Sequence, residues 1–120
     1  MAHDEAYYFA EKKIEKIQLS NTNELDLWGL GLTEIPESIY QLKQLRYLNI
    51  GSNLLSEIPS SFENLNRLNE LNISRNRLND VPDFFSSFTQ LRSLDISDNN
   101  LSTLKNSFGT LTQLQKLDIS

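Results

Sequence analysis

The strongest constraint on this chain is a repeat of 23 residues. Its three prolines, Pro36, Pro59 and Pro82, lie 23 residues apart, and each follows an aliphatic side chain. The same step relates the triplet Leu25–Leu27 to Leu48–Ile50 and to later triplets. It divides the sequence into an N-terminal segment, 1–21, four whole repeats, 22–44, 45–67, 68–90 and 91–113, and a partial repeat, 114–120. A fixed period of this length predicts a fold in which similar units stack.

Apolar residues support this division. They recur at seven positions of each repeat, which are occupied in the second repeat by Leu45, Leu48, Ile50, Leu55, Ile58, Phe62 and Leu65. Over the four repeats only Thr22 is polar at these positions, although the chain as a whole is 38% apolar. Chance would place roughly 11 apolar residues at 28 such positions, so the period reflects one repeated structural unit.

The spacing within one repeat predicts its local structure. Leu48 and Ile50 alternate with a period of two, which indicates a short strand with both side chains on one face. Asn53 follows where the backbone must turn, and Pro59 begins the return segment, where it withdraws one N–H. One such coil has no core of its own, whereas stacked coils bury a continuous apolar column and pair their strands into a parallel sheet.

An Asn recurs at the turn of three repeats, as Asn53, Asn76 and Asn99. A side-chain amide can both donate and accept hydrogen bonds. We therefore predict a structural ladder in which each amide bonds to the turn backbones of the coils above and below it.

The run from Leu45 to Leu65 resembles the typical leucine-rich repeat, and the resemblance extends over residues 22–120. It implies an α/β fold: a right-handed leucine-rich repeat solenoid, forming a segment of a curved horseshoe with short parallel strands on the concave side and an irregular convex side. The repeat length and the Ile-Pro pairs are similar to those of cytoplasmic scaffold-type repeats, including Ras-associated and Roco-type proteins. Two positions depart from the pattern, because Leu30 replaces an Asn and Lys105 replaces a Pro.

Residues 4–18 carry no repeat signal and predict a helix. Asp4 is a suitable N-cap, and Lys12, Lys13 and Lys16 would favour the helix C-terminus. Apolar residues fall on one face at helical spacing: Ala6, Ala10, Ile14 and Ile17. We predict that this helix caps the exposed apolar end of the first coil. The alternative is an amphipathic helix that binds a partner through Tyr7, Tyr8 and Phe9.

The composition argues against catalysis and metal binding. The chain has no Cys and a single His, His3. Disulfides and thiolate metal sites are therefore excluded, and a Ser-His-Asp triad has no suitably placed base. Carboxylate pairs such as Asp95 and Asp98 lack the regular loop of oxygen ligands that Ca²⁺ needs. We predict no catalytic residue, no cofactor and no metal.

The charge balance restricts the partners. There are 16 acids and 11 bases, and the net charge is -5. This argues against nucleic-acid binding, which requires clustered Lys and Arg. No apolar run reaches the length of about 20 residues that spans a membrane, and the N-terminus does not resemble a signal peptide. We therefore expect a cytoplasmic protein that binds neither membranes nor nucleic acids.

The concave side of the predicted sheet is the candidate site. Residues that flank the buried pair of each strand point to it, and we predict that the following bind a partner: Glu24, Asp26, Trp28, Tyr47, Asn49, Glu70, Asn72, Arg75, Asp95, Asp98 and Asp118. The acids predict a protein partner with a basic patch. Neither Asp26 nor Asp95 faces the core, so we expect their replacement by Lys to leave stability unchanged.

Trp28 and Tyr47 are the large aromatic residues of this side, and such residues are common binding anchors. Gly51, beside Trp28, leaves room for the indole to lie flat. The alternative for Trp28 is packing between the capping helix and the first coil, and the alternative for Tyr47 is a solvated strand residue. On the other side, Phe84 replaces a Ser and is interpreted as a filler of the core.

These features favour a protein-interaction module without catalysis. Two alternatives are the N-terminal sensing part of a larger signalling enzyme, such as a Roco-type GTPase or a kinase, and a purely structural spacer. The sequence ends at Ser120, soon after the fifth predicted strand. From this we expect either self-association through an uncapped C-terminal end or a longer native protein.

Overall fold

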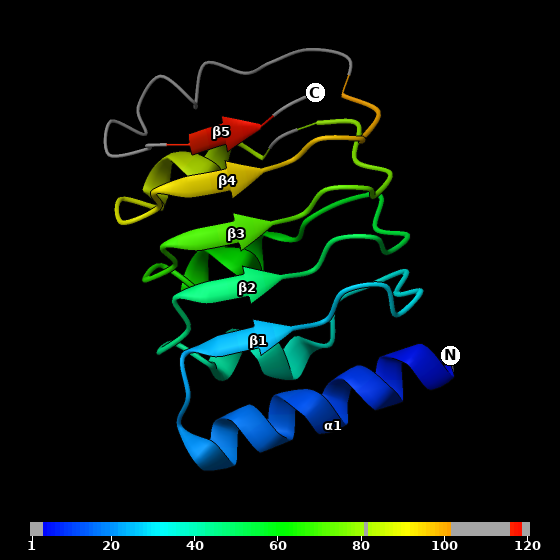
Figure 1. Cartoon of the computed structure of the whole chain (residues 1–120), viewed down its shortest axis with the longest axis vertical. Helices are drawn as coiled ribbons and strands as arrows, with labels where there is room; N and C mark the ends of the chain where they lie inside the picture. The colour runs from blue at the N-terminus through cyan, green and yellow to red at the C-terminus, as the bar shows by residue number, and fades with distance from the viewer. Residues whose placement is uncertain (1–3, 81, 102–115, 119–120) are drawn as a thin grey trace.

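A computed structural model describes residues 4–80, 82–101 and 116–118. It contains helix α1 (Glu5–Ser20) and a parallel sheet whose strand order follows the sequence. The strands are β1 (Glu24–Asp26), β2 (Tyr47–Asn49), β3 (Glu70–Asn72), β4 (Ser93–Asp95) and β5 (Lys116–Asp118). Short 3₁₀ helices, η1 (Glu37–Gln41), η2 (Ser60–Asn64) and η3 (Asp83–Ser87), lie behind the sheet, and α1 lies beside β1 at one end of the stack (Figure 1). The predicted solenoid is confirmed.

The sequence period is also the spatial period. Leu25 pairs with Leu48, Leu48 with Leu71, and Leu71 with Leu94, so each strand residue lies beside its counterpart 23 positions later. Each strand is only three residues long, and β1 to β4 bury their central Leu, as the two-residue alternation predicts.

The core lies between the sheet and the 3₁₀ helices. Leu and Ile side chains of successive coils form one continuous buried cluster. Aromatic rings extend this cluster on the convex side, where Phe62 and Phe88 meet edge to face at 6.0 Å between ring centroids. Phe84 is half-buried and packs against the core, with its ring 6.2 Å from that of Phe88, as expected for a filler.

Helix α1 closes the first coil. The Asp4 side chain accepts a hydrogen bond from the Tyr7 backbone N–H at 3.0 Å, so Asp4 is the predicted N-cap. The helix contacts β1 and η1 and buries Tyr7, Ala10 and Ile14. Tyr8 and Phe9 remain half exposed on its outer side.

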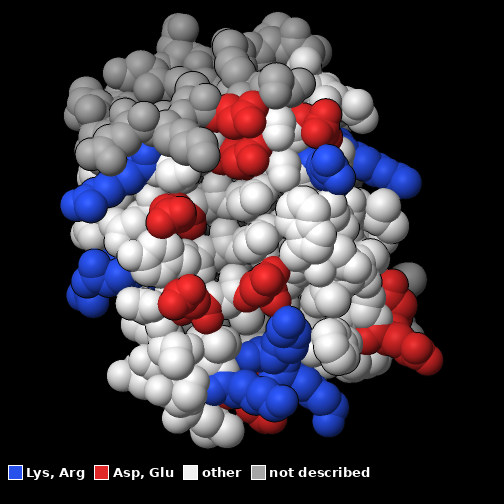
Figure 2. Space-filling view, in the orientation of Figure 1, with Lys and Arg blue, Asp and Glu red and all other residues white. Residues whose placement is uncertain are grey.

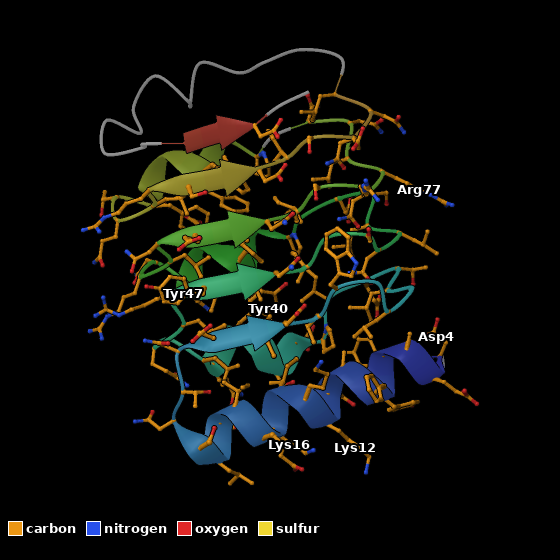
Figure 3. All side chains as sticks on the ribbon, in the orientation of Figure 1. Asp4, Lys12, Lys16, Tyr40, Tyr47 and Arg77 are labelled. Atoms are coloured by element: carbon orange, nitrogen blue, oxygen red, sulfur yellow. The ribbon has the colours of Figure 1, made fainter. Side chains whose placement is uncertain are left out.

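The C-terminal end of α1 differs from the expectation. The helix continues to Ser20 and ends at Asn21, whose positive φ of 56° stops it. The lysines expected near this end lie before the last turn, which has no basic residue. Lys12 and Lys16 instead extend away from the sheet (Figure 3).

Lys105 and the chain after Asp118 lie outside the described residues. The predictions made at these positions remain predictions.

Candidate functional site

The predicted binding residues share the concave face of the sheet. Most of them line one hollow across all five strands, with lining residues that include Glu24, Asp26, Tyr47, Asn49, Glu70, Asn72, Asp95 and Asp118. Trp28, Arg75 and Asp98 lie at the strand exits, outside this lining, and all three are exposed. The strand register therefore brings together residues that lie almost 100 positions apart.

Charge is unevenly distributed over this face. Acidic side chains lie over the strands, whereas basic side chains lie along the two margins of the sheet and over α1 (Figure 2). At one margin the Arg75 guanidinium lies 3.7 Å from the Asp98 carboxylate, and both side chains are well exposed. Such an exposed pair contributes little to stability, so Arg75 and Asp98 can still contact a partner.

One column of the face has a second role in the fold. A side-chain oxygen of Asp26, Asn49, Asn72 or Asp95 accepts a hydrogen bond from the backbone N–H two residues later, at 2.9–3.0 Å. These bonds form Asx turns that end each strand. A Lys at Asp26 or Asp95 would remove the acceptor. The geometry therefore does not support the expectation that Lys leaves stability unchanged, whereas Asn would keep the bond.

Two serines that the sequence interpretation missed complete these turns. The Ser74 hydroxyl donates to Asn72 Oδ1 at 2.7 Å, and the Ser97 hydroxyl donates to Asp95 Oδ1 at 2.6 Å. Both serines are buried. The signal was present in the sequence, because Asn or Asp followed two residues later by Ser recurs with the 23-residue period.

Trp28 lies against the second coil. A Cβ atom at Gly51 would come within 2.5 and 2.7 Å of two carbons of the indole ring, so the ring occupies the space that glycine leaves open. The Trp28 residue is 41% exposed and Tyr47 is 38% exposed. Both aromatics are therefore accessible, and Tyr47 lies at the start of β2 (Figure 3).

The Asn ladder connects each turn to the coil before it. The Asn53 side-chain oxygen accepts from the backbone N–H of Leu30 and of Leu32, at 3.1 and 3.0 Å. Its amide nitrogen donates to Leu27 O in the preceding coil and to Ile50 O in its own, both at 3.0 Å.

Asn76 and Asn99 repeat this arrangement. Asn76 accepts from the Leu55 N–H at 3.0 Å, and Asn99 accepts from the Leu78 N–H at 2.9 Å. We expected bonds to the coils above and below. In the described part of the chain the bonds of these amides reach their own coil and the preceding coil, because each side chain is directed back along the stack.

The described residues show no group of three or more His, Asp or Glu side chains that could hold a metal ion. Within the same part of the chain, no helix has the length and apolar character needed to cross a membrane.

Comparison with known proteins identifies the architecture. Residues 12–120 match the family described as "Leucine-rich repeat region". No curated protein matches the sequence. Among solved structures, the leucine-rich repeat protein LIC12759 of Leptospira interrogans is 33% identical with a TM-score of 0.81, and the match covers 89% of this chain and 27% of that one.

Two further structures are similar. The leucine-rich repeat domain of the type III effector XCV3220 (XopL) has a TM-score of 0.82 at 24% identity, with 94% of this chain and 41% of that chain covered. The BIR2 ectodomain from Arabidopsis thaliana has a TM-score of 0.67 at 31% identity, with 79% and 52% covered. This chain thus spans between about a quarter and a half of each of these proteins.

Proposed function

Because this chain belongs to the leucine-rich repeat family, whose domains generally bind protein partners, we propose that its concave face binds a basic segment of another protein. The supporting observation is the position of the acids over the strands, with the bases at the margins (Figure 2). Trp28 and Tyr47 supply apolar contact beside these acids.

The order of the face favours this role. Its backbone is held by the parallel ladder, and Asp26 and Asp95 are further held by their Asx turns. A partner therefore meets side chains that are already positioned, and less of the binding free energy is lost in ordering them.

The Asx turns make a sharp test possible. Because Asp and Asn form the same turn in this column, the two can be exchanged to change the charge while the turn is kept. Two double variants are compared. The first, Asp26→Asn with Asp95→Asn, removes two negative charges, and the second, Asn49→Asp with Asn72→Asp, adds two.

The binding measurements use peptides in which Lys or Arg flanks an apolar residue, selected from a display library against the unsubstituted protein. We expect the first pair of substitutions to slow association by roughly tenfold at low salt and the second pair to accelerate it, because charge complementarity acts mainly on the association rate. Melting temperatures should change little in both pairs.

Glu63→Gln, on η2, is the control and removes one exposed charge outside the concave face. If the selected peptides bind both double variants with the kinetics of the unsubstituted protein, the partner site lies elsewhere on the molecule.

A further inference from the structure

A second hollow lies beside α1 and shares no lining residue with the concave face. Its buried lining residues include Tyr7 of α1, Ile35, which lies just before η1, and Tyr40 of η1. Exposed carboxylates from the first and second coils also line it: Glu34, Glu37 and Glu57. The described lining contains no Lys or Arg. The hollow thus combines an apolar, aromatic floor with an acidic rim.

The Tyr40 hydroxyl is the second observation that points to a ligand. Tyr40 is only 8% exposed, and its hydroxyl has no hydrogen-bond partner in the structure. A buried polar atom without a partner is uncommon in native proteins, because its desolvation is not compensated. The neighbouring Tyr7 hydroxyl, in contrast, accepts from the Glu37 backbone N–H at 3.3 Å.

The electrostatics of the hollow favour a cation that donates hydrogen bonds. Burial raises the pKa of the Tyr40 hydroxyl, and the Glu37 carboxylate raises it further. Burial likewise raises the pKa of Tyr7. Both phenols therefore stay neutral at physiological pH, and the carboxylates of the rim supply the negative charge.

We propose that this hollow binds the guanidinium group of an arginine side chain from a partner protein. A guanidinium is planar and stacks on aromatic rings, while its apolar stem suits a floor that contains Ile35. It carries five N–H donors and no acceptor. The Tyr40 hydroxyl is closed off from solvent in the free protein, so one donor satisfies it only after the side chains that line the hollow move, while other donors reach the exposed Glu37 and Glu57.

The test is a titration of the isotope-labelled protein followed by NMR, with N-acetyl-arginine amide as the probe. We expect saturable shifts of the backbone amides of Glu37, Tyr40 and Glu57. The matching citrulline derivative has the same shape without the charge, and it should not produce these shifts. Equal binding of both compounds would overturn the proposal.

Two variants assign the binding to this hollow. Glu37→Gln should raise the Kd by about tenfold, since a charge-assisted hydrogen bond is lost. Tyr40→Phe should raise the Kd severalfold without lowering the melting temperature, because the hydroxyl that it removes has no partner in the free protein. A merely structural hydroxyl would give the opposite pattern, with a lower melting temperature and unchanged binding.

Controls separate this site from the concave face. Glu63→Gln and the Asp26→Asn, Asp95→Asn pair should leave the arginine titration unchanged. If that pair abolishes binding and Glu37→Gln does not, the arginine binds on the concave face, and the proposal for the second hollow is wrong while the concave proposal is supported. An unchanged Kd in all variants would overturn the second site alone.

Discussion

The first coil, 22–44, differs from the two coils that follow it in the residue that stands at its turn. The second and third coils carry Asn53 and Asn76 at the turn, and each amide bonds back to the preceding coil. The first coil has Leu30 at this position, and Leu30 packs against the core. The difference shows that the side-chain oxygen of each Asn accepts hydrogen bonds from the turn of the coil before its own. Only α1 precedes the first coil, so no Asn is needed there, and the turn of the first coil is satisfied by Asn53.

A second difference is the type of residue that lies three positions beyond the end of each strand: glycine in the first coil and a residue with a side chain in the later coils. The backbone there has positive φ in every described coil, with values of 68° at Gly29, 53° at Ser52, 54° at Arg75 and 55° at Asp98. Glycine adopts this conformation without strain, whereas other residues do not. The inner coils accept the strained conformation, and their N–H groups at this position still donate to the next coil, as from Ser52 to Ser74 O at 2.9 Å.

The largest expected effect is in the Asn ladder. Asn76→Ala removes the acceptor of the buried Leu55 N–H and leaves that donor unpaired. It also removes one donor to Ile50 O, which keeps its hydrogen bond from Asn53. We expect it to lower the free energy of unfolding by about 1–3 kcal/mol, as measured by denaturant titration.

Asn66→Ala, in an exposed turn, is the control and should change the free energy little. The converse substitution, Leu30→Asn, should not stabilise the protein, because no coil precedes the first. A loss below about 0.5 kcal/mol for Asn76→Ala would show that water replaces the amide.

The next effect concerns the strand exits. Gly29→Ala should destabilise the protein by about 1–2 kcal/mol through the backbone alone, since a Cβ there meets no atom within 4 Å. In the second coil, Ser52→Gly relieves the strain but adds unfolded-state entropy, so its net effect should stay within about 0.5 kcal/mol of zero. Thermal melts of both variants check this, and equal losses would contradict the role assigned to φ.

The smallest expected loss of stability is at the contact between the first and second coils, where Trp28 packs on Gly51. Gly51→Ala forces the Trp28 ring away from the second coil. Because the Trp28 residue is already 41% exposed, the ring can move outward, and the cost should remain below about 1 kcal/mol, less than in a closed core.

The readout for Gly51→Ala is a red shift of tryptophan emission, to which Trp28 alone contributes because the chain has a single Trp. In a Trp28→Ala background the same change should lose most of its cost, and what remains comes from the 3.0 Å approach of the new Cβ to Asn72 Oδ1. An unshifted spectrum would mean that the indole does not rest on Gly51 in solution.

Much of this architecture was predictable because it follows from spacing within one repeat. The alternation of Leu48 and Ile50 predicted the strand and its buried face, and the period predicted the register. Asp4 and the apolar face of residues 6–17 predicted the capping helix, apart from its last turn. The acids of the concave face could be aligned for the same reason, because residues 23 positions apart are neighbours in a stack.

Periodicity was therefore sufficient to assign the Leu and Ile side chains of the core and the residues that share a column, since it records the position of each residue within its coil. Three other features became visible in the folded chain alone: the coil to which each Asn side chain bonds, the Asx turns of Asp26 and Asp95, and the packing of Trp28 on Gly51. The same holds for the Tyr40 hydroxyl, which is buried without a hydrogen-bond partner in a hollow lined by three glutamates. These features depend on side-chain rotamers and on the distance between coils, and a repeat pattern specifies neither.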